Sequence, residues 1–200
     1  MGMALAAEAL RRGARVDLVL GAHQVPPPPG ARVIEAESAE DMADRLRDAV
    51  PGADALIMAA AIADYKPRKV GKTKAAKSGR GLKLSLDRTP DILSGLSRGP
   101  SRPTLVVGFS AETGSLLPKA RAKLRGKNAD LIVANRVGKP GIGFGEGALA
   151  EGYLVGRKGR ARPFRKISKD RLAGLVLAEM ERLLGARRPK AGRSGPSREA

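Results

Sequence analysis

Four short apolar runs, separated by helix-forming segments, constrain the fold of this 200-residue chain more than any other feature. The runs cover residues 14–20, 54–61, 104–109 and 130–135, and each has the length of a strand. A run that is apolar throughout, such as 54–61, is typical of a strand buried on both faces. Strands that alternate with helices form a largely parallel sheet. The sequence therefore predicts an α/β domain whose mostly parallel sheet is covered by helices on both faces.

Local signals indicate where the other elements begin and end. Ser38 and Ser168 precede helical stretches, and the turn 156–159 separates two short runs that predict a hairpin. Thr89 is expected to cap a helix that begins at Pro90, because proline suits the first helical position. We expect residues 1–185 to form one domain and the Arg/Pro/Gly/Ser-rich segment 186–200 to be a disordered basic tail.

The segment 62–86 is rich in glycine and lysine, which argues against a strand buried in the main sheet. Leu82, Leu84 and Leu86 alternate with polar residues in its last part, as they would in an exposed β-hairpin. A bare row of leucines on a strand edge promotes association. We therefore expect an arm outside the main sheet whose leucines are covered by a second subunit, so that the protein is a homodimer.

The formal net charge of +18 is concentrated in a few segments. Residues 1–65 carry a net charge of −4, whereas 66–88 carry +8, 118–139 carry +6 and 157–171 carry +7. Such clusters suit a phosphorylated small ligand, although a solvated basic surface and a nucleic-acid backbone are alternatives. With two Tyr, three Phe and no Trp, the chain has few rings on which bases could stack, which disfavours nucleic acid.

Composition also bears on the cellular compartment. The chain has no cysteine, so disulfides and thiolate metal sites are excluded. It has no apolar run of the roughly 18 residues that a membrane span needs, and no signal-peptide pattern at its start. The expectation is a soluble cytoplasmic protein with no membrane partner.

In parallel sheets ligands bind beyond the carboxyl ends of the strands. Here those ends lead to Asp64, which could hold ribose hydroxyls or a metal, and to Phe109, which could pack on a base. Lys119, Lys123 and Lys127 recur every four residues and so share one face of a helix. Taken singly, each of these residues has a structural explanation. Asp64 could lie in a solvated turn, Phe109 could be a core aromatic, and the lysine row could be a solvated helix face.

Five segments taken together are more specific than any one of them. They are Ala-Ala-Ala-Ile-Ala-Asp-Tyr-Lys-Pro (59–67), Lys-Ala-Ala-Lys-Ser-Gly (74–79), Thr-Pro-Asp-Ile-Leu (89–93), Val-Gly-Phe-Ser-Ala-Glu-Thr (107–113) and the lysine-to-asparagine stretch 123–135. In this order they resemble the phosphopantothenate–cysteine ligase family over residues 1–184. The resemblance implies a Rossmann-like fold, usually in a homodimer.

The resemblance also implies a reaction. CTP activates the carboxylate of 4′-phosphopantothenate as an acyl-cytidylate with the help of Mg²⁺, and the amine of L-cysteine then displaces CMP, in coenzyme A biosynthesis. A flavin-dependent decarboxylase is the implied partner. By position, the implied catalytic residue is Lys74, and the implied substrate-binding residues are Ala60 and Asn135. The implied nucleotide-binding residues are Asp64, Lys74, Pro90, Asp91, Ile92, Leu93, Phe109, Lys123 and Lys127.

Two departures from the family pattern stand out. The family's Lys-Ile-Lys-Lys stretch is Lys74-Ala75-Ala76-Lys77 here. Family members also carry a strand and a Gly/Ser/Asn-rich loop, with an asparagine implicated in handling the acyl-cytidylate, before the helix that opens here at residues 1–2. This sequence has no counterpart to them, which leaves a catalytically inactive nucleotide-binding fragment or scaffold as the alternative function.

Overall fold

The computed structural model describes residues 1–69, 83–145 and 147–187. They form five helices and nine strands, in the order α1 (Gly2–Arg11), β1 (Asp17–Leu20), β2 (Arg32–Glu35), α2 (Ala39–Ala49), β3 (Ala55–Met58), β4 (Tyr65–Pro67), β5 (Leu86–Arg88), α3 (Ile92–Arg98), β6 (Leu105–Glu112), α4 (Leu116–Gly126), β7 (Leu131–Arg136), β8 (Ala150–Gly156), β9 (Arg162–Ile167) and α5 (Lys169–Gly185). None of these helices has the length and apolar character that crossing a bilayer requires.

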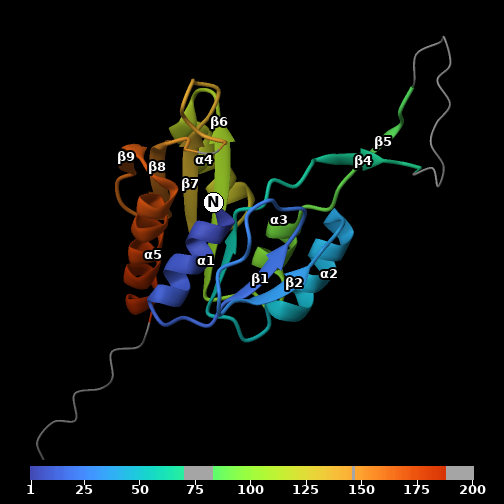
Figure 1. Ribbon diagram of the computed structural model, residues 1–200, viewed down its shortest axis with the longest axis horizontal. Coiled ribbons are helices and arrows are strands. Elements are labelled where there is room, and N and C mark those ends of the chain that lie inside the picture. The colour runs from blue at the N-terminus through green and yellow to red at the C-terminus, as the bar shows by residue number, and fades with distance from the viewer. Residues whose placement is uncertain (70–82, 146, 188–200) are drawn as a thin grey trace, which may run out of the picture.

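A five-stranded sheet in the order β3-β6-β7-β8-β9 forms the centre of the molecule (Figure 1). Its first three strands are parallel, and the hairpin of β8 and β9 continues it in antiparallel fashion. Helix α4 packs across β6, β7 and β8, while α5, with α1 beside it, covers the other face. The predicted α/β architecture is therefore confirmed, and so is the hairpin predicted around 156–159.

The apolar strands of the sheet are not all buried to the same extent: β6 and β7 are more buried than β3. Leu105, Val107, Leu131 and Val133 are fully buried, as the apolar runs of β6 and β7 predict. In β3 only Leu56 is buried, whereas the prediction for 54–61 was burial on both faces. The reason is topological: among the described residues β3 pairs with β6 alone, so it is an edge strand of the five-stranded sheet.

Strands β1 and β2 form a separate parallel pair. In the described chain β1 has no backbone pairing with β3, although both strands border the same core. Val19 of β1 and Met58 of β3 pack against one hydrophobic cluster, and Val16 and Ile57 pack against the other. One edge of β1 and one edge of β3 are therefore without a strand partner among the described residues.

The arm begins as a short antiparallel ladder in which Tyr65 pairs with Arg88 and Pro67 with Leu86. It projects from the body of the domain and pairs with neither of the other sheets (Figure 1). Leu84 and Leu86 are 64% and 51% exposed, as the alternation predicted. Lys74, Lys77 and Leu82 lie outside the described residues.

The helix starts follow the predicted signals in two of three cases. The hydroxyl of Ser38 accepts from the backbone N–H of Asp41, whose carboxylate accepts from the N–H of Ser38, so α2 has a complete capping box. Ser168 caps α5. The third prediction was wrong by two residues: α3 begins at Ile92, and Asp91 is its N-cap.

The buried carboxylate of Asp130 forms ion pairs with three arginines that are far apart in the sequence. Asp130, 3% exposed, accepts from the backbone N–H of Val106 at 2.8 Å and lies 2.6 Å from Arg102, 3.1 Å from Arg157 and 2.7 Å from Arg187. Arg187 thereby holds the start of the segment 186–200, for which disorder was predicted; residues 188–200 lie outside the described chain.

Candidate functional site

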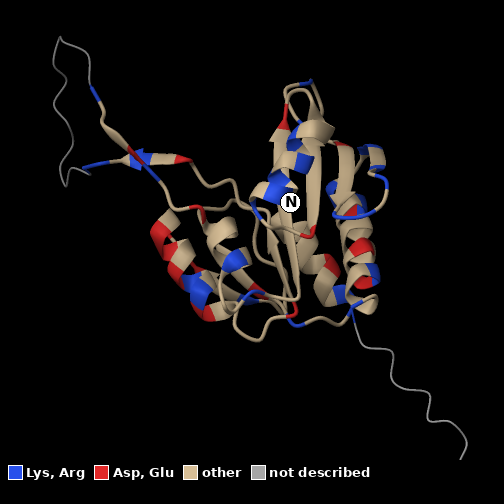
Figure 2. Ribbon diagram, turned by 180° about the vertical axis from the view of Figure 1, so that it is seen from behind, with Lys and Arg blue, Asp and Glu red and all other residues tan. Residues whose placement is uncertain are grey.

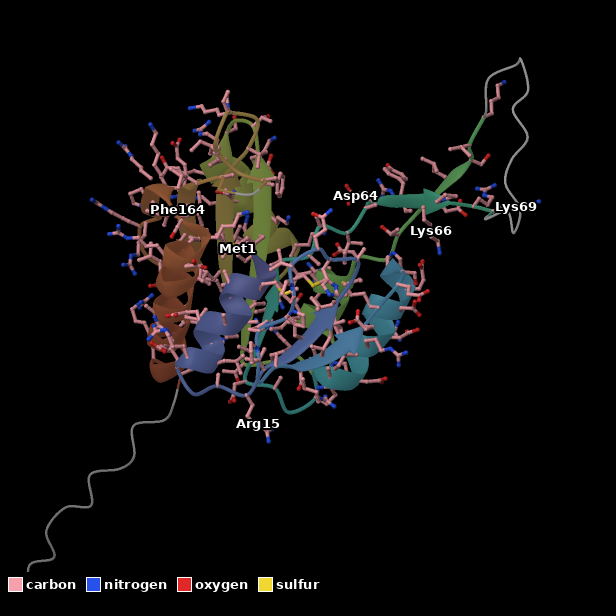
Figure 3. The ribbon with its side chains drawn as sticks, in the orientation of Figure 1. Met1, Arg15, Asp64, Lys66, Lys69 and Phe164 are labelled. Carbon is pink, nitrogen blue, oxygen red and sulfur yellow. The ribbon has the colours of Figure 1, made fainter. Side chains whose placement is uncertain are left out.

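The candidate site lies where β3 and β6 end, beside α4. The loop after β3 carries Asp64 at the base of the arm (Figure 3). Thr89, at the other end of the arm, fixes this loop: its backbone N–H donates to the Asp64 carbonyl at 3.0 Å, and its hydroxyl donates to the Ala63 carbonyl at 2.5 Å. The residue predicted as a helix cap therefore holds the two strands of the arm together at their root.

Lys123 is the central cation of the site. Its ammonium donates to the backbone carbonyl of Phe109, with 2.5 Å between Nζ and the oxygen. Burial lowers the pKa of Lys123, and the nearby charge of Lys127 lowers it further. The carboxylates of Glu112, Asp64 and Asp91 lie close enough to oppose that shift. A desolvated ammonium at a strand end is a strong attractor for phosphate oxygens.

Lys127 reaches the site from the end of α4 by an ion pair with Asp91. The Asp91 carboxylate also accepts from the backbone N–H of Ser94 at 3.1 Å, so one side chain caps α3 and orients a lysine. Burial alone would raise the pKa of Asp91, but the bond from Lys127 and the bond from Ser94 outweigh it and lower the pKa. The structure therefore brings together Lys123, Lys127, Asp64 and Asp91, and their role in nucleotide binding stays a prediction.

Glu112 also belongs to this cluster, although sequence reasoning gave it no role. It ends β6, accepts from the buried hydroxyl of Ser110 at 2.8 Å and pairs with Lys119 at 2.7 Å. The bond from Lys119 lowers the pKa of Glu112, burial opposes this, and the Ser110 bond adds to the lowering. The signal that could have found it is the seven-residue spacing between a strand-end glutamate and the lysine row of the following helix.

Close packing beneath the site explains the glycine before Phe109. A Cβ on Gly108 would lie 2.9 Å from the side chain of Leu93 and 3.0 Å from that of Ile132, so only glycine lets α3 approach β6 this closely. Ile92 and Leu93 are themselves 6% and 7% exposed. Of the predicted nucleotide-binding residues around Pro90, these two can therefore offer only backbone groups to a ligand.

The remaining predicted site residues are not seen to place their side chains beside Lys123 and Lys127 in the described chain. The ring of Phe109 is half-buried against the cluster under α5, on the face of the sheet away from α4, and its carbonyl is what meets Lys123. The side-chain oxygen of Asn135 accepts from the backbone N–H of Glu151 at 3.3 Å, in contact with β8. Ala60 is exposed in the loop after β3. Lys74 lies outside the described residues.

Carboxylates at this site are dispersed, and no group of three or more side chains suited to a metal occurs in the described parts of the chain. Asp64, Asp91 and Glu112 come from three different elements, and two of them are engaged by lysines. A divalent cation that is carried in by phosphate oxygens and keeps most of its water needs only one or two protein carboxylates. The exposed carboxylate of Asp64 fits that limited requirement.

Comparison with known proteins decides the family. Residues 1–184 match the family described as the DNA/pantothenate metabolism flavoprotein C-terminal domain. The chain belongs to this family. It is 42% identical over 146 residues to the coenzyme A biosynthesis bifunctional protein CoaBC of Bacillus subtilis, covering 72% of this chain and 36% of that protein. It is 37% identical over 187 residues to CoaBC of Mycobacterium tuberculosis, covering 88% and 44%.

The fold of the family is equally clear from solved structures. The C-terminal domain of a CoaBC protein superposes with a TM-score of 0.74 at 28% identity, covering 92% of this chain and 82% of that one. The DNA/pantothenate metabolism flavoprotein from Streptococcus pneumoniae has the same fold, with a TM-score of 0.74 at 19% identity and coverage of 90% and 86%. The chain thus spans less than half of the length of the curated relatives, and it corresponds to their C-terminal domain.

Proposed function

We propose that this domain is a phosphopantothenate–cysteine ligase, which joins 4′-phosphopantothenate and L-cysteine by way of an acyl-cytidylate formed from CTP. The observation that carries the proposal is the convergence of Lys123, Lys127 and Asp64 where the parallel strands β3 and β6 end. Membership of a family whose relatives act in coenzyme A biosynthesis supports it. A complex of phosphopantothenate–cysteine with a structural neighbour of the same fold points to the same chemistry.

The residues suit the activation step for an elementary reason. A carboxylate becomes a good electrophile only when one of its oxygens becomes part of a phosphate leaving group. Pyrophosphate carries negative charge as it departs, so cations fixed beside the triphosphate lower the barrier. Lys123 is held by the Phe109 carbonyl, and Lys127 by Asp91. Both ammonium groups are therefore positioned before any ligand arrives.

The lysine–carboxylate pairs also allow an exchange of partners. Lys119 is paired with Glu112, and Lys127 with Asp91. A triphosphate brings several oxygens of higher charge density, to which these ammonium groups can turn with little movement. When bound to the triphosphate, Mg²⁺ would supply further positive charge for pyrophosphate loss, and the exposed carboxylate of Asp64 would be a ligand for it.

The test of the proposal is pyrophosphate release in the presence of CTP, Mg²⁺, 4′-phosphopantothenate and cysteine. Lys123→Ala should lower the rate strongly, and Arg45→Ala, on the exposed face of α2, serves as the matched control. Formation of the cysteine adduct should be followed by mass spectrometry in the same samples. A chain that releases pyrophosphate at the same rate with and without Lys123 would disprove the assignment.

A second candidate is favoured by the divided sheet. Because one edge of β1 and one edge of β3 are without a strand partner in the described structure, no backbone hydrogen bonds join the two sheets there. Such a chain could bind a nucleotide at the lysine cluster without completing the ligation, as an inactive fragment or scaffold. Nucleotide binding in calorimetry together with absence of adduct formation would select this function over the first.

A further inference from the structure

Two basic segments that are far apart in the sequence meet on one surface of the molecule. Arg121 and Arg125 lie on the exposed side of α4, and Figure 2 shows the basic residues along this helix. The turn between β8 and β9 adds Arg157, Lys158 and Arg160. Helix α4 packs on β8, which brings the turn to the end of the helix. Helix α2, in contrast, carries Glu40, Asp41, Asp44 and Asp48.

A hollow of about 520 Å³ lies between the helix and the turn. Arg121, Arg125 and Arg157 line it together with Ala161, whereas Leu124 and Val155, which also border it, are only 7% and 3% exposed. This volume is within the range of small-molecule sites. All residues that line it belong to the described chain, and none of them is an Asp or Glu.

The charge of this hollow is not neutralised locally. Arg121, Arg125, Lys158 and Arg160 make no ion pair within the described residues. Arg157 is held in place by the carbonyl oxygens of Ala129 and Asn128, at 2.9 and 2.8 Å. Its one carboxylate neighbour, Asp130, is shared with two other arginines. A fixed guanidinium beside two unpaired ones is a favourable arrangement for a phosphate group, which arginine binds in bidentate fashion.

The hollow is separate from the lysine site. At 100° per residue, Arg121 and Lys123 point about 200° apart around α4, on opposite sides of its buried face. The strand register places Gly156 opposite Leu131, so the turn lies at the amino end of β7. Lys123, Asp64 and Glu112 of the candidate ligase site lie toward the other end, where β6 finishes, whereas Lys127 extends to the site from the end of α4 that is next to the hollow. A ligand in the hollow therefore does not contact Lys123 or Asp64.

We propose that this hollow is a second binding site, for a phosphorylated organic molecule whose phosphate meets Arg121, Arg125 and Arg157 and whose organic part fills the remaining space beside Ala161. The volume of the hollow, which is larger than one phosphate group, is the feature that favours such a molecule over inorganic phosphate. It also favours it over a nucleic-acid backbone, which would extend along a basic surface without filling a hollow. Nothing in the proposal depends on the ligase reaction, because the site shares no residue with it.

The test uses phenyl phosphate and inorganic phosphate as probes, with calorimetry at low salt. The full chain should carry Lys123→Ala and Lys127→Ala, so that the first site does not contribute. Phenyl phosphate should bind, inorganic phosphate should bind about tenfold more weakly, and Arg121→Gln with Arg125→Gln should lower the affinity for phenyl phosphate about tenfold or more. The exposed pair Arg45→Gln with Arg47→Gln removes the same charge from α2 and should leave the affinity unchanged.

Each alternative result overturns the proposal. If Arg45→Gln with Arg47→Gln lowered the affinity for phenyl phosphate by the same factor, net charge alone would govern binding. Equal affinity for the two probes would show that the organic part of the ligand makes no contact in the hollow. A duplex oligonucleotide that binds more tightly than phenyl phosphate, and weakens in the Arg121 and Arg125 variant, would assign the surface to nucleic acid. Because both arginines are exposed, circular dichroism should show an unchanged fold in every variant.

Discussion

The ammonium of Lys123 and the backbone carbonyl of Phe109 are joined by a hydrogen bond of 2.5 Å that links α4 to the end of β6. If this lysine also holds the nucleotide phosphates, Lys123→Ala should weaken CTP binding by about 1–3 kcal/mol, the range for a charge-assisted contact. Calorimetry on the wild type and the variant measures the difference directly.

Lys127→Ala should weaken binding in the same direction, and Arg45→Ala on α2 is the control for loss of one positive charge. Unchanged dissociation constants for both lysine variants would show that the lysine row is only a solvated helix face.

Glu112 provides a second prediction, because it orients Lys119 and contributes to the field around Lys123. Glu112→Gln keeps the shape and the acceptor for Ser110 but removes the charge. Lys119 should then be freed, and CTP should bind about as tightly or more tightly, because a competing carboxylate is gone. The maximal rate should nevertheless fall, since the ammonium is no longer held in place. A loss of affinity with no change in the rate would contradict this role.

Asp130 provides a prediction about stability. It is buried and accepts from one backbone N–H while three arginines surround it. Asp130→Asn keeps the size but removes the charge, so we expect a loss of about 1.5–3 kcal/mol in the free energy of unfolding. Urea denaturation measures this loss. Asp44→Asn, in an exposed pair on α2, should change the stability by less than about 1 kcal/mol.

The same carboxylate makes stability depend on pH. Burial alone would raise the pKa of Asp130, but the bonds from Arg187, Val106 and Arg102 together outweigh it, so the pKa is lowered in the folded protein. The unfolded chain therefore binds the proton more readily, and stability present above the unfolded pKa is lost as the pH falls through the folded one. Bonds from Arg11 and Arg12 likewise lower the pKa of Glu8 to about 2. Acid unfolding should begin below about pH 4 and should be less steep in Asp130→Asn.

The arm provides a prediction about assembly. Leu84 and Leu86 are largely exposed beside the short ladder of β4 and β5. If a second subunit covers them, the folded protein should be a dimer in light scattering at micromolar concentration. Leu84→Lys with Leu86→Lys should shift it toward the monomer without loss of helical signal. A wild-type protein that is monomeric and folded under these conditions would refute a dimer formed through the arms.

The divided sheet provides the last prediction. An unpaired buried backbone group costs about 1–3 kcal/mol, against a total stability of about 5–15 kcal/mol. A version of the chain extended before Met1 by the strand and loop that the family carries should pair the edges of β1 and β3. We expect it to unfold at a higher temperature and to release pyrophosphate faster than the 200-residue chain. Equal melting temperatures and equal rates would show that the strand is dispensable.

Much of the fold followed from local patterns. The apolar runs of β6 and β7, the capping box at Ser38 and the hairpin at 156–159 were all predictable, because a helix cap or a turn depends on residues a few positions apart. The start of α3 was missed since Thr89, an acceptable cap by type, instead bonds to the loop at Ala63. That contact spans 26 residues, and no local signal encodes it.

The candidate site divides in the same way. By itself the sequence determined the family, the row of lysines on α4 and the strand ends to which ligands come, since these rest on residue types at fixed spacing. Only the tertiary structure decided that Glu112 and Asp91 hold the lysines, that Phe109 contributes its carbonyl and turns its ring to the other face, and that β3 lies at an edge. Each of these depends on which strands and helices become neighbours, and that is settled by packing between residues far apart in the chain.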